Sequence, residues 1–268
     1  MSEARFRFYA ELNDFLPAAK RQVEFAHRFQ GRPAVKDLIE AIGAPHTEVD
    51  LILANGRSVD FTYAVRDGDR ISVYPVFETL DIGPVVRVRP EPLREPRFAC
   101  DTHLGRLAAY LRMLGFDTWY RNDSPDAELA RLAGGGAPRP PMGGQQSGGD
   151  HTGSPLRERR ILLTRDRGLL KRSEVTHGYW VRETNPRLQL REVVRRFELA
   201  GAATPFRRCL RCNGLLEAAT KDAVFDRLPP RTRDTFDEFR VCTACGQVYW
   251  PGSHYERMRQ LIDWSLGE

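Results

Sequence analysis

The stretch RFACDTHLGRLAAYLRMLGFDTWY, residues 97–120, decides the fold of the larger part of this chain. A short apolar run ends at Asp101, and an amphipathic helix that stops at Gly115 follows it. The apolar stripe of this helix consists of Leu104, Leu107, Ala108, Leu111 and Leu114. A second strand-like run covers 116–121. This strand–helix–strand order predicts parallel strands covered by helices.

The same alternation continues towards the C-terminus. Helices are expected at 126–133, 168–173 and 186–201, and strands at 159–166 and 177–183. Together these segments predict an α/β region over 96–203 with a parallel sheet. Residues 134–155, GGGAPRPPMGGQQSGGDHTGSP, interrupt this alternation of strands and helices. Their Gly- and Pro-rich composition predicts a flexible insertion.

Residues 1–82 read as a separate, small α+β domain. A strand is expected at 4–12, an amphipathic helix at 33–43, and a hairpin at 49–61 around the turn Asn55-Gly56. A final strand follows Asp67-Gly68-Asp69. Residues 83–95, which are rich in proline and basic charge, predict an extended linker to the α/β region.

The segment RDGDRISVYPVFE, residues 66–78, makes this domain resemble a ubiquitin-like β-grasp domain of the small bacterial sulfur carriers. Those carriers end in a free Gly-Gly tail that is activated at its carboxylate. Here the corresponding region reads TLDIGPVV with a lone Gly83, and the chain continues. A role as a sulfur-transfer or conjugation factor is therefore disfavoured, and the domain is a candidate site for a protein partner.

Four of the five cysteines form two close pairs, CLRC and CTAC, separated by 29 residues. Two residues between thiolates let both reach one ion from a tight turn, and two such turns complete a tetrahedral site. The ligands are Cys209, Cys212, Cys242 and Cys245. Because four thiolates leave no open position, the sequence predicts a structural Zn²⁺ in a ribbon with a C-terminal helix over 204–268.

Aspartates follow three successive strands of the predicted sheet. Asp101 and Asp166 come directly after apolar strands, and Asp123 and Asp126 follow the strand between them. Because the carboxyl ends of parallel strands meet at one edge, these side chains are expected to gather there. Close carboxylates repel one another unless a divalent cation lies among them, and oxygen ligands suit Mg²⁺ or Mn²⁺. The alternative is that each aspartate only caps the helix after it.

The segments CDTHLGRLAAYLRMLGFDTWY, DSPDAELARLA and RRILLTRDRGLLKR resemble the Mut-seven C-terminal RNase family, a branch of the PIN-like nucleases. The resemblance covers about residues 96–250. It implies a PIN-like sheet flanked by helices, with Asp101, Asp126 and Asp166 as catalytic acids around Mg²⁺ or Mn²⁺. Such nucleases often carry a further acid two residues after the last one, and Gly168 takes that position here.

Several neighbours of these acids are candidates for supporting roles. Asp123 and Glu128 are candidates for further catalytic carboxylates, and Thr164 either contacts the scissile phosphate or braces the turn. Three arginines are candidates for contacts to RNA phosphates or, alternatively, are ordinary surface residues. They are Arg106, Arg165 and Arg167.

Charge and composition fit an RNA partner in the cytoplasm. Residues 1–82 hold 10 Lys and Arg against 13 Asp and Glu, so the rest of the chain, with 31 against 23, carries a net charge of +8. A basic region of this kind suits a polyanion such as RNA. The first residues lack a signal-type apolar core, and no apolar run approaches the ~18 residues that span a bilayer. The sequence therefore favours a metal-dependent ribonuclease, and the alternative is a non-catalytic RNA-binding or adaptor protein.

Overall fold

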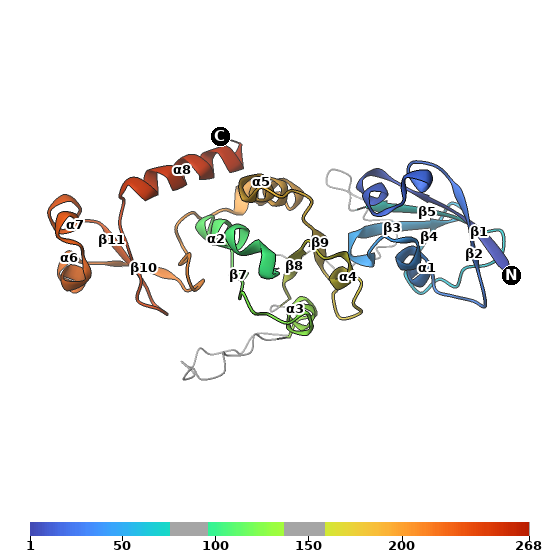
Figure 1. The fold of residues 1–268 in the computed structure, drawn as a ribbon, viewed down its shortest axis with the longest axis horizontal. Coiled ribbons are helices and arrows are strands. Elements are labelled where there is room, and N and C mark those ends of the chain that lie inside the picture. Colours follow the sequence, from blue (N-terminus) through green and yellow to red (C-terminus); the bar gives the residue numbers. More distant parts are fainter. Residues whose placement is uncertain (76–95, 137–158, 268) are drawn as a thin grey trace. The chain divides into compact units, whose positions relative to one another are not determined.

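The computed structural model describes residues 1–75, 96–136 and 159–267, which Figure 1 shows coloured along the chain. The chain forms two compact units. One unit comprises Met1–Arg94 and Ala130–Trp180, and the other comprises Glu95–Leu129 and Val181–Glu268. The expected linker, Gly83 and most of the expected insertion lie outside the described residues. The domain boundaries inferred from sequence stay a prediction.

The N-terminal domain is a five-stranded sheet with strand order β2-β1-β5-β3-β4 and one α-helix (Figure 1). Strands β1 and β5 pair in parallel at its centre, and the other neighbours pair antiparallel. The elements are β1 (Ser2–Phe8), β2 (Phe25–Phe29), α1 (Val35–Ile42), β3 (Val49–Ala54), β4 (Arg57–Val59) and β5 (Arg70–Pro75). This is the β-grasp topology expected from the sequence.

Local sequence explains the elements of this domain. Alternate residues of β1 are buried, and the apolar stripe of α1 packs on the same core. Helix α1 ends at Gly43, whose φ is 142°. Glycine adopts a positive φ without the steric cost that a side chain would add. Asn55 and Gly56 both have positive φ, at 51° and 80°, and join β3 to β4 in a two-residue turn. The helix and the hairpin are therefore confirmed at the expected positions.

Two features of the domain differ from the sequence expectation. Strand β2 was not expected, because only Phe29 of its five residues is buried and the pattern is weak. It forms because it pairs with β1 along the edge of the sheet. The strand expected at 4–12 ends at Phe8, and the short 3₁₀ helix η1 (Ala10–Phe15) takes the remaining residues.

The α/β region contributes parallel strand pairs, as expected. In one unit β6 pairs with β7 in parallel, and in the other β8 pairs with β9 in parallel. The strands are β6 (Phe98–Cys100), β7 (Thr118–Trp119), β8 (Ile161–Thr164) and β9 (Gly178–Trp180). The helices are η4 (Thr102–Leu104), α2 (Gly105–Met113), α3 (Asp126–Ala133), α4 (Arg167–Leu170), α5 (Pro186–Arg196) and η6 (Leu199–Ala202). The helix expected over 186–201 is interrupted before Leu199, where Glu198 is left-handed.

The C-terminal part forms a three-stranded antiparallel sheet in the order β10-β11-β12, followed by a long helix that packs on α5 (Figure 1). Its elements are β10 (Leu216–Ala219), α6 (Lys221–Val224), η7 (Phe225–Arg227), α7 (Pro230–Thr235), β11 (Phe239–Cys242), β12 (Val248–Tyr249) and α8 (Ser253–Leu266). Among the described residues, no helix is long and apolar enough to cross a membrane.

Candidate functional site

Asp101 lies at the end of β6 and caps the helical turn that follows. Its side chain is only 7% exposed, and its Oδ1 accepts a hydrogen bond from the His103 N–H at 2.8 Å. The His103 imidazole Nδ1 lies 3.6 Å from the same oxygen. The carboxylate is thus fixed at the carboxyl end of a strand, where the sequence predicted it. Oδ1 of Asp101 therefore caps this turn, and a catalytic role for the residue stays a prediction.

Asp166 repeats this arrangement after β8. Its Oδ1 accepts the Gly168 N–H at 2.7 Å at the start of α4. The Thr164 hydroxyl, which is completely buried, accepts the Asp166 N–H at 2.9 Å. Thr164 therefore braces the turn, which was one of its two expected roles. A Cβ added to Gly168 would lie 3.1 Å from Asp166 Oδ1, so the glycine leaves room for the capping carboxylate.

The third acidic group lies at the start of α3. Asp126 is the first residue of the helix and is exposed. Arg121 forms a two-bond pair with Asp123, at 3.1 and 3.2 Å, and its NH1 lies 3.6 Å from Glu128 Oε2. The hydrogen bonds from Arg121 lower the pKa of Asp123. Asp123 and Glu128 are therefore linked through one arginine.

The predicted catalytic acids are divided between the two compact units. Asp101 and Asp126 belong to one unit and Asp166 belongs to the other. Their convergence on one metal ion stays a prediction. Arg106 is exposed on α2, and Arg165 is exposed beside Asp166, so both stay candidates for phosphate contacts.

The guanidinium of Arg167 is held between two aromatic rings of the same unit. It lies 3.9 Å from the centre of the Trp180 ring and 5.1 Å from that of Phe15. It also donates a hydrogen bond to the Asp14 carbonyl at 3.2 Å. The Trp180 indole donates to the Arg165 carbonyl at 3.2 Å. The turn that carries Asp166 is thus held on both sides of the aspartate, partly by the β-grasp domain.

Further contacts join the β-grasp domain to the β8–α4–β9 segment. The short helix η3 (His46–Glu48) contributes a completely buried carboxylate, Glu48, which accepts the Trp180 N–H at 2.7 Å. The His46 ring contacts the Val175 carbonyl at 2.9 Å and the Glu40 carboxylate at 2.6 Å. Trp180 packs against the β-grasp core. No sequence pattern singled out these residues, because the contacts of Glu48 with Trp180 and of His46 with Val175 each join positions more than a hundred residues apart.

We expect Arg167→Ala to lower the free energy of unfolding of this unit by roughly 1–2 kcal/mol, because it removes a partly desolvated cation–π contact and a hydrogen bond. Arg172→Ala is the matched control, since within the described part of the chain Arg172 pairs with the exposed Glu174 at 3.4 Å. Thermal and denaturant unfolding of the full chain measure both variants. Equal stability of the two variants would contradict the holding role of Arg167.

The four cysteine sulfurs form a cluster that can hold a metal ion such as zinc. All four Sγ atoms lie within 4.8 Å of one another. The Cys209–Cys245 and Cys212–Cys242 sulfurs are 3.7 and 3.4 Å apart. Tetrahedral zinc with about 2.3 Å bonds requires sulfurs about 3.8 Å apart, so the donor set fits. A Cβ on Gly214 would lie 2.9 Å from Cys242 Sγ, so glycine is needed beside the cluster.

Hydrogen bonds around Cys209 favour its thiolate form. Burial of this sulfur opposes ionisation, but hydrogen bonds from the Tyr249 hydroxyl and from the backbone of Cys212 and Arg211 outweigh it. Together they lower the pKa of Cys209 to about 7. The Tyr249 oxygen lies 3.1 Å from the sulfur and accepts the Leu210 N–H at 3.2 Å. A thiolate is the form that binds metal.

Two polar side chains tie the first cysteine turn to the α2–β7 corner. Arg112 is 5% exposed and donates to the carbonyls of Thr118, Leu210 and Arg211 at 2.9–3.1 Å. Asn213 accepts the Thr118 N–H at 3.0 Å and donates to Asp117 at 2.7 Å. Burial lowers the pKa of Arg112, and the nearby cysteines oppose this effect. Sequence reasoning missed both residues, because nothing in their local pattern distinguishes them.

The fold and site define a class of protein: a β-grasp domain joined to an α/β region that has acids after its strands and a four-cysteine ribbon. The family model described as Mut7-C RNAse domain matches residues 96–136 and 151–262, which is more than half of the chain. The chain therefore belongs to the Mut7-C RNAse domain family. A second model, described as Mut7-C ubiquitin, matches residues 1–81. Both the suspected family and the ubiquitin-like domain are thus confirmed.

Solved structures similar to this chain cover its N-terminal domain. Small archaeal modifier protein 1 of H. volcanii is 17% identical, with 28% of this chain and 98% of that chain covered and a TM-score of 0.23. A Pyrococcus furiosus protein described as a molybdopterin converting factor, subunit 1, is 23% identical, with the same coverage and a TM-score of 0.23. No curated protein shows a significant match to the chain.

Proposed function

We propose that this protein is a metal-dependent ribonuclease that hydrolyses RNA phosphodiester bonds. The observation that carries the proposal is the Mut7-C RNAse match, whose two segments include Asp101, Asp126 and Asp166. We propose these three aspartates as the ligands of Mg²⁺ or Mn²⁺. Carboxylate oxygens are the ligands that these ions prefer. A divalent ion bound there would lower the pKa of a water and stabilise the leaving oxygen of the phosphodiester.

The residues around these acids support a fixed arrangement. The backbone N–H of His103 donates to Asp101 Oδ1, and that of Gly168 donates to Asp166 Oδ1. Each bond orients one carboxylate. Thr164 and the Trp180 indole hold the turn around Asp166. A site of this kind gains from orientation of its groups before substrate binds. Arg106 and Arg165 are proposed to bind RNA phosphates, in keeping with the net charge of +8 over 83–268.

We also propose that the cysteine cluster holds a structural Zn²⁺. We propose a cytoplasmic location as well, because cysteines stay reduced in the cytoplasm and can bind metal. The proposal also includes a protein partner for the β-grasp domain, since a ubiquitin-like domain is present. An adaptor that binds RNA without cutting it is the second candidate. Gly168, which stands where related nucleases often have an acid, favours that candidate.

Cleavage of labelled single-stranded and structured RNAs tests the function. The wild-type chain is incubated with Mn²⁺, Mg²⁺ or EDTA, beside the variant Asp166→Asn. Asparagine still caps α4, so the turn is kept while the charge is lost. We expect cleavage that needs the divalent ion and that the variant lacks. Tight RNA binding without cleavage under every metal condition would contradict the ribonuclease proposal and favour the RNA-binding adaptor.

A further inference from the structure

The ribbon sheet has two unlike faces. On one face Phe239 and Val248 join Val224 and Leu228 in a small apolar core. On the other face Ala218, Arg240 and Tyr249 stand directly opposite one another across β10, β11 and β12. Successive residues of a strand point to opposite faces, so this second face is separate from the core. It carries an arginine and an aromatic ring side by side.

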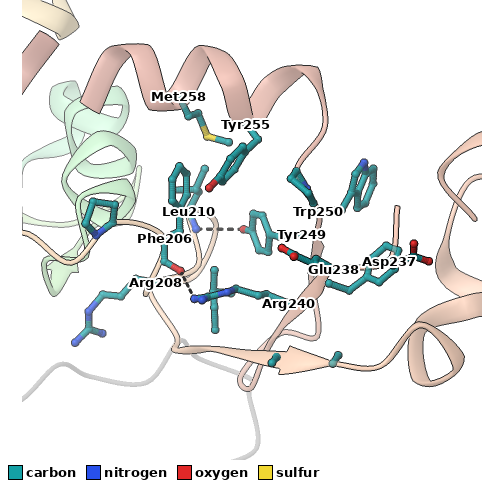
Figure 2. Close-up of a pocket in the computed structure, with 16 residues that line it drawn as sticks. Phe206, Arg208, Leu210, Asp237, Glu238, Arg240, Tyr249, Trp250, Tyr255 and Met258 are labelled. Atoms are coloured by element: carbon teal, nitrogen blue, oxygen red, sulfur yellow. Dashed lines mark hydrogen bonds between the residues drawn. The ribbon is translucent and has the colours of Figure 1, made fainter. Parts of the chain in front are cut away.

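A cavity of about 580 Å³ lies over this second face. Figure 2 shows the Phe206 ring and, on α8, the Tyr255 and Met258 side chains beside Tyr249. Trp250 also lines the cavity, so Phe206, Tyr249, Trp250 and Tyr255 are among the aromatic residues of its wall. The volume lies within the range of pockets that bind small ligands.

The aromatic rings are held in place before any ligand binds. Phe206 and Tyr255 have ring centres 4.6 Å apart at 32°, and Phe206 has a left-handed backbone with φ 60°. A bulky residue rarely adopts this conformation, and it persists only where the surrounding contacts hold it. Figure 2 shows the two hydrogen bonds that fix the wall, from Arg240 to the Phe206 carbonyl and from Leu210 N–H to Tyr249.

The charged groups of the cavity restrict the class of ligand. Arg240 is exposed at the sheet face, whereas Arg208 points away from the rings in Figure 2 and donates to the carbonyls of Gly115 and Asn213. Glu238 directly precedes β11, two residues before Arg240, and also lines the cavity. A ligand that suits these groups has a flat aromatic part, an anionic part and amino donors. A nucleotide has all three.

We propose that this cavity binds an unpaired nucleotide of single-stranded RNA. The base stacks on the aromatic wall, the phosphate pairs with Arg240, and an exocyclic amino group donates to Glu238. Paired bases of a duplex do not offer their faces for stacking, so the cavity selects single strands. The inference deepens the proposed function, on which it rests, by naming the form of RNA that the chain holds.

Binding of a short labelled oligoadenylate, followed by fluorescence anisotropy, tests this site. The full zinc-loaded chain with Asp101→Asn is used, so that cleavage does not consume the probe. Tyr255→Leu keeps apolar volume but removes stacking, and we expect Kd to rise about tenfold. Arg240→Gln keeps a donor for the Phe206 carbonyl, and we expect a severalfold rise in Kd with a salt dependence reduced by about one charge.

Two controls lie on α8 outside the cavity. Trp264→Leu removes an exposed aromatic ring stacked under Arg191, and Arg257→Gln removes an exposed charge. Both are expected to bind the oligoadenylate like the parent chain, and the same sequence in a duplex is expected to bind more weakly. Equal binding by the cavity variants and the controls, or equal binding of duplex, would overturn the inference. Cleavage by the wild-type chain is scored separately, so loss of the nuclease proposal and loss of this site give different results.

Discussion

Replacing Asp101 with asparagine is expected to slow RNA cleavage at least about a hundredfold, because even outer-shell partners of a catalytic metal are worth 10- to 100-fold. Asparagine caps helices about as well as aspartate, so the hydrogen bond from His103 is retained. We therefore expect the free energy of unfolding to change by less than roughly 0.5 kcal/mol. Single-turnover cleavage and thermal unfolding measure the two quantities.

Asp222→Asn is the matched control for that experiment. Asp222 is exposed on α6 and is not among the candidate acids, so the loss of its charge is expected to leave the cleavage rate within a few-fold of wild type. Raising the Mn²⁺ concentration is expected to restore part of the activity of Asp101→Asn, because a weakened metal site fills at higher concentration. An equal loss of activity in both variants would show that the effect is not specific to the predicted site.

Removing the metal ion that we propose for the four cysteines is expected to unfold the ribbon. Its apolar core cluster has four buried residues. A core of this size is too small to stabilise such a domain without a structural metal or disulfides. Structural zinc contributes about 10–16 kcal/mol in zinc-finger peptides. We expect Cys242→Ser, or a strong chelator, to abolish the cooperative unfolding transition of the ribbon and expose it to protease. Zinc content and limited proteolysis of the full chain measure both effects.

Cys100→Ala is the control, since Cys100 is completely buried in β6 and burial raises the pKa of its thiol. We expect this variant to retain one zinc ion per chain. In the metal-free chain the pKa of Cys209 is lowered from 9.0 to about 7, which sets the sign of the pH dependence of its stability. The stability that this group contributes is complete above pH 9 and is lost as the pH falls through about 7. Zinc retention that is unchanged in Cys242→Ser would contradict the four-cysteine site.

Features that depend on neighbours in sequence were predicted from the sequence. The stripe of α1, the Asn55-Gly56 turn and the two cysteine pairs each depend on spacings of a few residues. The positions of Asp101 and Asp166 after their strands follow from the same local rules. Strand β2 escaped detection because its pattern is weak and its pairing with β1 stabilises it.

Features that join distant segments were decided only by the tertiary structure. The sequence by itself determined the α/β order, the β-grasp domain, the two close cysteine pairs and the places of Asp101 and Asp166 after their strands, because backbone geometry and side-chain periodicity specify them locally. The tertiary structure alone showed that Phe15 and Trp180 enclose Arg167, and that Arg112 reaches the carbonyls of the first cysteine turn. Such contacts depend on how the chain packs across long separations, and no local spacing encodes that packing.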